Sequence, residues 1–170
     1  RDLAALLDTM AGPDPRQPHS LVQAPTLPQI GGGAQGLRIG WLADWGGALT
    51  MEKGVLDLCA DALRQMADIG VHVDTMNAPF DRDALWGSWI TLRSWSVAGS
   101  LAPLYDDPDK REHLKDTAVW ETGRGLALSA MDVHRASVIR SDWFKTSAAL
   151  FNQYDVLALP SAQMWPFHVD

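Results

Sequence analysis

The sequence predicts an α/β protein with a mixed, largely parallel sheet flanked by helices. Two observations predict this class: a strand–helix–strand pattern over residues 37–76, and a further apolar strand over residues 154–159 that follows long helical stretches. The strand–helix–strand unit predicts parallel strands with a right-handed crossover. A chain of 170 residues suits one domain and is long enough to build a real core.

The first 36 residues predict a helix followed by a connection. Apolar residues recur at helical spacing over residues 2–11, before Gly12 and Pro13. Residues 12–36 contain five prolines and a run of three glycines, which predicts an extended surface connection. The pattern G-x-G-x-x-G within residues 31–36 is followed by a strand, whereas a dinucleotide site follows a strand and opens a helix, so a linker is the better interpretation.

Residues 37–76 predict two strands around one helix. The apolar run 37–42 is typical of a buried strand, and residues 44–50 form a turn. Residues 51–69 place apolar and acidic side chains on opposite faces of a helix that ends at Gly70. Alternation over residues 71–76 indicates a strand nearer the edge of the sheet.

The segment 81–100 predicts a helix with an aromatic stripe. Trp86, Trp89 and Trp95 recur at helical spacing together with leucines. Each tryptophan buries a large apolar area, so we expect the stripe to lie in the core rather than in a binding site.

The remaining segments predict further helices and a last strand. Residues 106–116 are a charged loop or short helix, and residues 126–152 are a long helical stretch. That stretch is apolar on more than one face, which is typical of a helix covered on two sides. The apolar strand at 154–159 is halted by Pro160.

These segments make one incomplete domain over residues 1–170: a helix with its Pro/Gly-rich connection (1–36), a strand–helix–strand unit (37–76), and helices with a late strand and pocket-side loop (81–170). The first residue is Arg1 rather than Met, and the chain stops at Asp170 just beyond an apolar, proline-containing stretch. We therefore expect both ends to be cuts through a longer protein.

Composition excludes several classes of partner. The formal net charge is −7 with a pI near 5.0, and the four lysines are scattered, so we expect neither nucleic acid nor an anionic membrane surface as a partner. No apolar run is long enough to span a membrane. The single Cys59 excludes an internal disulfide and fits a reducing, cytoplasmic compartment. Homo-oligomers remain open.

We identify no catalytic residue, cofactor site or metal site in the sequence. The acidic run 106–113 lacks the turn glycine and the distal glutamate of a calcium loop, so a solvated charged segment is the better interpretation. Ser129 and His134 are five residues apart on a predicted helix and point to different sides, which argues against a serine triad with Asp132. Cys59 lies on an apolar helix face and is expected to be inert.

The segment after the last strand is the candidate substrate pocket. Ligands of open α/β sheets bind beyond the carboxyl ends of the strands. Ser161, Gln163 and Trp165 follow Pro160 there, and they combine an apolar wall with a few polar groups. A loop that packs against another domain is an equally open interpretation.

Three segments resemble the amidase signature family in the order in which that family carries them. "RDLAALLDTMAGPDPRQPHSL" resembles the helix and aGpDp-x-Dp loop immediately downstream of the catalytic signature region. "LRIGWLADWGGALTMEKGVLDLCADALRQMADIGVHVD" resembles the following strand–helix–strand, and "FNQYDVLALPSAQMWPFHVD" resembles the late strand and loop. Together they cover about two thirds of the chain.

The resemblance implies part of an amidase-signature fold and of a hydrolase that cleaves carboxylic amides with a Lys–Ser–Ser triad. None of the motifs of that triad occurs here: the glycine run 31–33 lacks the serines of the family's Gly/Ser-rich loop, and no lysine has a matching context. Gln17 replaces the aspartate usual in the Dp-x-Dp loop.

We therefore expect a fragment that is inactive alone, with the triad outside residues 1–170 and a small-molecule amide as the substrate of the full-length parent. The alternative is a non-catalytic α/β binding or scaffold module.

Overall fold

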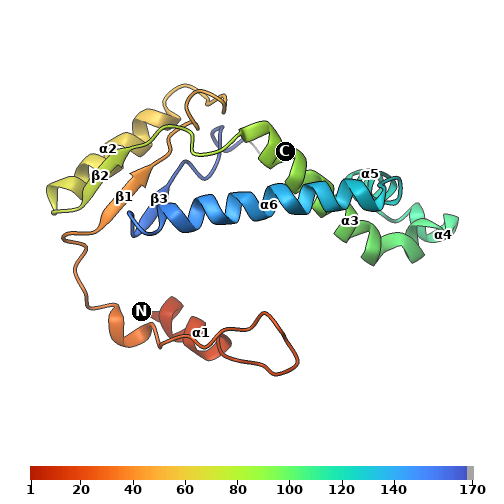
Figure 1. Ribbon diagram of the computed structural model, residues 1–170, viewed down its shortest axis with the longest axis horizontal. Helices are drawn as coiled ribbons and strands as arrows, with labels where there is room; N and C mark the ends of the chain where they lie inside the picture. Colours follow the sequence, from red (N-terminus) through yellow and green to blue (C-terminus); the bar gives the residue numbers. More distant parts are fainter. Residues whose placement is uncertain (168–170) are drawn as a thin grey trace. The chain divides into compact units, whose positions relative to one another are not determined.

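The computed structural model describes residues 1–167 and forms two compact units, Arg1–Gln35 and Gly36–Asp170 (Figure 1). Residues 168–170, the end of the predicted pocket-side segment, lie outside the described residues. The first unit contains helix α1 (Asp2–Met10), as predicted, and a short 3-10 helix, η1 (Leu27–Gln29). The Asp8 carboxylate accepts hydrogen bonds from the backbone N–H of Thr26 (2.7 Å) and Leu27 (2.9 Å), which holds η1 against α1.

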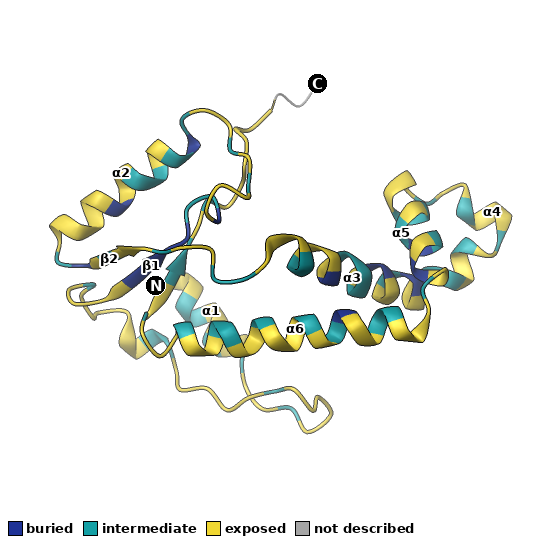
Figure 2. Ribbon diagram, turned by 45° about the horizontal axis from the view of Figure 1, so that its top comes forward, coloured by how far each residue is buried: buried dark blue, intermediate teal, exposed yellow. Residues whose placement is uncertain are grey.

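The second unit contains a parallel sheet in the order β2-β1-β3, formed by β1 (Arg38–Trp41), β2 (His72–Thr75) and β3 (Val156–Ala158). Ile39 of the central strand pairs with Val73 on one side and with Val156 on the other. In Figures 1 and 2, α2 lies along one side of the sheet and the last turns of α6 lie on the other. The predicted α/β class with a largely parallel sheet flanked by helices is confirmed.

Helix α2 (Val55–Asp68) connects β1 to β2. It begins four residues later than the sequence predicts, because Gly54 adopts a left-handed conformation (φ 90°) that a helix cannot contain. The segment before it is held elsewhere, since the backbone N–H of Glu52 donates to the carbonyl of Gln163 (2.7 Å). Val55 and Leu63 of α2 are buried together with apolar residues of β1 and of the turn before β2.

Four helices lie between β2 and β3: α3 (Arg82–Tyr105), α4 (Pro108–Arg111), α5 (Asp116–Leu126) and α6 (Ala130–Leu150). The Asp81 side chain caps α3 by accepting from the N–H of Ala84 (2.8 Å), and α3 continues five residues beyond the predicted end. The helical stretch predicted over 126–152 is α6, which begins four residues later than predicted because Ser129 and Asp132 form a capping box there.

Small residues form the contact between α3 and α5. Ser94 and Thr122 are fully buried, and Ala98 is 4% exposed. A Cβ atom added at Gly125 of α5 would collide with the backbone carbonyl of Ser94 and with the Cβ of Ala98. The absence of a side chain at Gly125 therefore lets the two helix backbones approach each other closely.

The prediction that the tryptophan stripe of α3 lies in the core is wrong. Trp86, Trp89 and Trp95 are 55%, 47% and 55% exposed, whereas α3 buries Ser88, Ser94 and Ala98. The reason is geometric: α3 turns its face of small residues to α5 and α6, because only small side chains permit the observed close approach.

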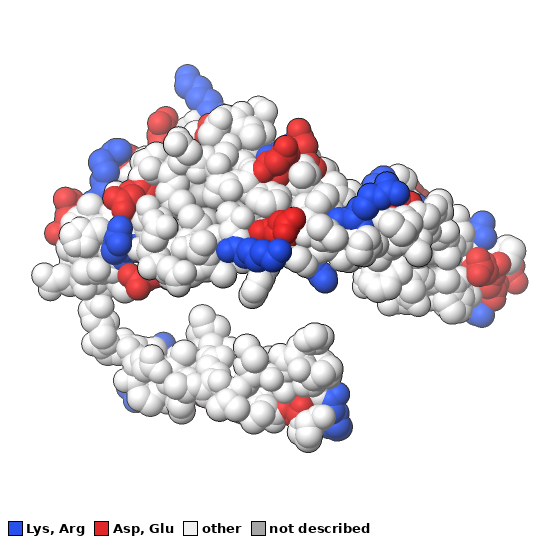
Figure 3. All heavy atoms as spheres, in the orientation of Figure 1, with Lys and Arg blue, Asp and Glu red and all other residues white. Residues whose placement is uncertain are grey.

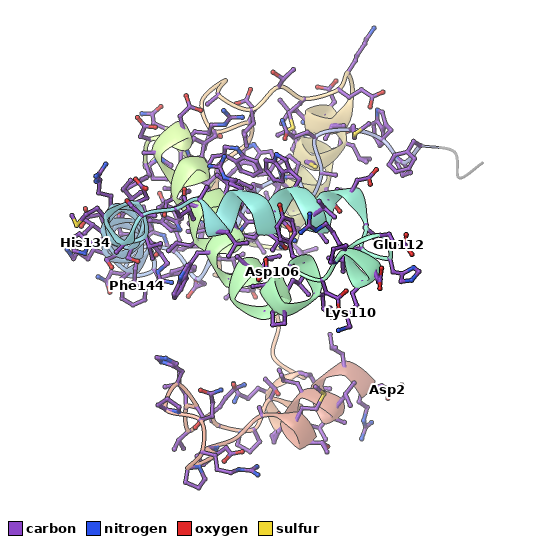
Figure 4. The ribbon with its side chains drawn as sticks, turned by 90° about the vertical axis from the view of Figure 1, so that its right-hand side faces the viewer. Asp2, Asp106, Lys110, Glu112, His134 and Phe144 are labelled. Atoms are coloured by element: carbon purple, nitrogen blue, oxygen red, sulfur yellow. The ribbon has the colours of Figure 1, made fainter. Side chains whose placement is uncertain are left out.

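Helix α6 is covered on one side only, which contradicts the predicted cover on two sides. Ala136 is its one buried residue, and Phe144 is 71% exposed. Figure 4 shows Phe144 and His134 at the outer side of α6. Within the described part of the second unit, residues 36–167, the apolar side chains on this side of α6 face solvent.

The chain exposes an unusually large surface. Its accessible area is 12469 Å², whereas two separate globular bodies of these sizes would expose about 9,600 Å² together. The smaller area already counts the two units as separate bodies. The larger observed area is therefore not a consequence of how the two units are placed. Within residues 1–167, no helix is both long and apolar enough to cross a membrane.

Candidate functional site

Two hollows adjoin the carboxyl ends of β1 and β3. The turn after β1 contains two non-glycine residues in the left-handed region, Ala43 (φ 49°) and Trp45 (φ 59°), followed by Gly46 and Gly47. Such strained conformations persist where the surrounding structure enforces them, and they cluster at functional sites. The segment 159–167 leaves β3 at the same edge, which is where parallel α/β sheets bind ligands.

The larger hollow has a volume of about 850 Å³, which is within the range of small-molecule sites. Its walls come from the turn after β1, the first half of α3, the middle of α6 and the segment after β3. The residues that line it are Trp45, Leu49, Arg82, Leu85, Trp86, Ser88, Trp89, Leu92, Arg93, Arg140, Trp143, Leu159 and Gln163.

One wall of the larger hollow is a packed aromatic cluster. The Trp45 side chain is 6% exposed overall, and its indole N–H donates to the carbonyl of Phe80 (2.8 Å). The ring of Trp143 from α6 lies 5.6 Å from that of Trp45 and 5.8 Å from that of Phe80. These tilted and edge-on arrangements are favourable for aromatic pairs, so this wall is held in place from three elements.

A second part of the lining is an exposed aromatic pair on α3. The rings of Trp86 and Trp89 stack 4.9 Å apart with an interplanar angle of 24°. The guanidinium of Arg93 lies 5.4 Å from the centre of the Trp89 ring and forms an ion pair with Glu121 of α5. Hydrogen bonding and the charge of Glu121 raise the pKa of Arg93 further above its ordinary value.

The smaller hollow, about 380 Å³, lies between α2 and the segment after β3. Its lining residues are Val55, Leu58, Cys59, Pro160, Ser161, Ala162, Met164, Trp165, Pro166 and Phe167. The segment is tied to the turn before α2: the backbone N–H of Trp165 donates to the Glu52 carboxylate (2.8 Å), and its indole N–H donates to the carbonyl of Lys53 (3.1 Å).

The structure does not bring the three predicted pocket residues into one hollow. Gln163 lines the larger hollow, whereas Ser161 and Trp165 line the smaller one. Sequence reasoning missed Trp45 and Trp143, which form the packed aromatic wall of the larger hollow. The rule that pointed to residues 160–167 also applies to Trp45, because Trp45 follows the carboxyl end of β1 as closely as they follow β3.

The polar groups noted in the sequence have structural roles here. Ser129 and Asp132 hydrogen-bond to each other as the cap of α6, which lowers the pKa of Asp132, mainly through the Ser129 hydroxyl. The segment 106–116 contains the short helix α4 and mixes both signs of charge at the surface (Figures 3 and 4). Among the described residues, no three His, Cys, Asp or Glu side chains come together as a set of metal ligands.

Comparison with known proteins identifies the family. The sequence model of the amidase family matches residues 1–170. The chain belongs to the amidase signature family. The chain is 30% identical over 165 residues to an acylamidase of Rhodococcus erythropolis. The matched region is 94% of this chain and 33% of that protein.

A solved structure confirms the fold of this amidase-family chain. The chain matches a crystal structure of a bacterial aryl acylamidase of the amidase signature family with a TM-score of 0.86 at 20% identity. The match covers 98% of this chain and 36% of that one. The chain thus spans about a third of the length of the relatives it matches.

Proposed function

We propose that residues 1–170 are part of an amide hydrolase that cleaves carboxylic amides to an acid and ammonia or an amine. The observation that carries this proposal is the family match over the whole chain. The similarity to an acylamidase over 94% of the chain agrees with it.

We assign the Lys–Ser–Ser triad of the family to a segment outside residues 1–170. In such a triad a lysine acts as base, through a bridging serine, on a nucleophilic serine, and backbone N–H groups stabilise the oxyanion. Within the described residues no lysine hydrogen-bonds to a serine hydroxyl; Lys110 and Lys145 instead pair with Asp107 and Asp142. On this proposal the 170 residues alone do not hydrolyse amides.

The large exposed surface supports a body that extends beyond these residues. Phe144 and Trp95, which do not line the larger hollow, are more exposed than aromatic side chains of a closed core. Residues 1–170 would then form an incomplete domain that completes a larger amidase, in line with the third of the relatives' length that they span.

The contribution of this chain to the reaction is one side of the substrate pocket. Gln163 would face the substrate from the larger hollow, and Ser161 and Trp165 would shape the neighbouring wall. Gln163 donates its amide N–H to the carbonyl of Thr50 (2.7 Å), which fixes the side chain and leaves its oxygen free to accept from a substrate amide.

The test compares residues 1–170 alone with the same residues joined to the upstream and downstream parts of their own reading frame. Both are assayed for ammonia or amine release from a panel of aliphatic and aryl amides. We expect hydrolysis by the joined protein and none by residues 1–170. Hydrolysis by residues 1–170 alone would contradict the placement of the triad. A folded joined protein that cleaves no amide would favour the binding or scaffold module.

A further inference from the structure

The charges around the larger hollow differ in sign from those of the chain as a whole. The chain has a formal net charge of −7, yet the hollow's lining contains three arginines and no acidic residue. A concave site lined by one sign of charge attracts ligands of the opposite sign. The lining is otherwise dominated by tryptophan and leucine, which favour a flat apolar group.

Two of the three arginines already have acidic partners. Arg93 pairs with Glu121, whose side chain is 12% exposed, and Arg82 pairs with Asp83. Among the described residues, no carboxylate lies within ion-pair distance of Arg140, which is exposed on α6 one turn before Trp143. Arg140 is therefore the cation of this lining that is available to an external anion.

We propose that the larger hollow binds an aromatic group that carries a carboxylate. The ring packs between the fixed wall of Trp45 and Trp143 and the stacked pair on α3, and the carboxylate pairs with the guanidinium of Arg140. If the chain is part of an amide hydrolase, its substrates are then aromatic amides that carry a negative charge. This statement about substrates rests on the proposed function. Arg140 selects the substrate through its charge and takes no part in the cleavage of the amide bond.

Binding is tested by calorimetric titration of the chain with 2-naphthoate and with its neutral counterpart 2-naphthamide. We expect 2-naphthoate to bind more tightly. Arg140→Gln should weaken the binding of 2-naphthoate about fivefold and leave 2-naphthamide unchanged, because only an exposed ion pair is lost. Trp89→Leu should weaken both ligands about fivefold, because both use the aromatic wall.

The matched control is Arg135→Gln. Arg135 is also an exposed arginine on α6, but it lies near Asp132 (3.9 Å) and does not line the hollow, so its loss should change neither affinity. Circular dichroism of each variant confirms that it is folded. Equal affinities for the two ligands, an unchanged affinity in Arg140→Gln, or no binding of either ligand would each overturn the proposal.

The outcome separates this proposal from the proposed function, since binding of 2-naphthoate requires no turnover. If the joined protein hydrolyses neutral and anionic aryl amides equally well, the specificity role of Arg140 is wrong and the amidase function stands. If 2-naphthoate binds as expected but the joined protein cleaves no amide, the site stands and the amidase function is wrong.

Discussion

The sheet region and the helical region of the second unit bury opposite kinds of side chain. Around β1 and α2 the buried residues are large and apolar: Ile39, Trp41, Leu42, Leu63 and Val71. In α3, α5 and α6 the buried residues are small or hydroxyl-bearing: Ser88, Ser94, Ala98, Thr122 and Ala136. The large aromatic side chains of α3 point outward instead.

This difference shows two ways of holding a structure together. The sheet region gains stability from burying large apolar surface, at about 25 cal/mol for each Å² removed from water. The helical region gains its stability from close backbone contact, because small residues let the helices approach. The helical region thereby leaves its tryptophans free to form the wall of the larger hollow.

The largest effect is expected from Gly125→Leu in α5. A side chain here collides with the backbone of Ser94 and the Cβ of Ala98, so α3 and α5 must separate. We expect a loss of roughly 3–5 kcal/mol in the free energy of unfolding, measured by urea denaturation with far-UV circular dichroism.

Gly99→Ala in α3 is the matched control. Nothing lies within 4 Å of the Cβ that this change adds. Alanine in an exposed helix position should stabilise the chain by about 0.5–1 kcal/mol. If Gly125→Leu were as stable as the parent chain, close backbone contact would not be what holds α5 to α3.

The second prediction probes the sheet region through Leu63→Ala. Leu63 is 8% exposed on the side of α2 that faces the sheet, and its truncation leaves a cavity. We expect a loss of about 2–3 kcal/mol, measured in the same way. Leu58→Ala, on the same helix but at a site that is 58% exposed, should cost less than about 1 kcal/mol. Equal losses in the two variants would contradict the placement of the core.

Regular patterns in the sequence were enough to predict the type of each element in the sheet region. The amphipathic helix and the alternation around Val73 repeat with the period of their element, and the apolar run 37–42 has the length of a buried strand, so the type of each element could be predicted. The start of α2 could not, because it depends on the backbone conformation of Gly54 and on a hydrogen bond to Gln163, more than a hundred residues away.

The helical region and the site were harder to predict for a physical reason. Gly123 and Gly125 weaken the helical pattern of α5 in the sequence. Gly125 is nevertheless the residue that lets α5 pack closely against α3. The exposure of Trp86 and Trp89 depends on which face of α3 the other helices cover, and the sequence pattern of α3 alone does not contain that information. The pocket-side segment was predicted from the edge of the sheet, whereas nothing local marks Arg140.

A third, smaller effect is expected from Ser88→Ala at the contact of α3 with α6. The buried Ser88 hydroxyl donates to the carbonyl of Ala136 (2.7 Å). Its removal should cost about 1 kcal/mol, measured by urea denaturation. Ser96→Ala, at an exposed site on α3, should be neutral. An equal cost at both sites would mean that the hydroxyl contact does not help to hold α6.

The smallest expected effect is an acid-induced loosening of the start of α6. The hydrogen bond from the Ser129 hydroxyl, followed by that from its backbone N–H, holds the pKa of Asp132 below its ordinary value. A carboxyl with a lowered folded pKa stabilises the folded state above its unfolded pKa of about 3.9, and this stabilisation is lost as the pH falls through the folded pKa.

Amide hydrogen exchange at the first turn of α6, followed from neutral pH into the acid range, measures this loss. The protection there should decline at low pH in the parent chain. In Asp132→Asn it should be low at every pH, because the asparagine lacks the carboxylate charge and does not titrate. Asp142→Asn removes only an exposed pair with Lys145 (3.0 Å) and keeps the cap, so it should retain the decline of the parent chain. A decline that persists in Asp132→Asn would mean that another group controls the start of α6.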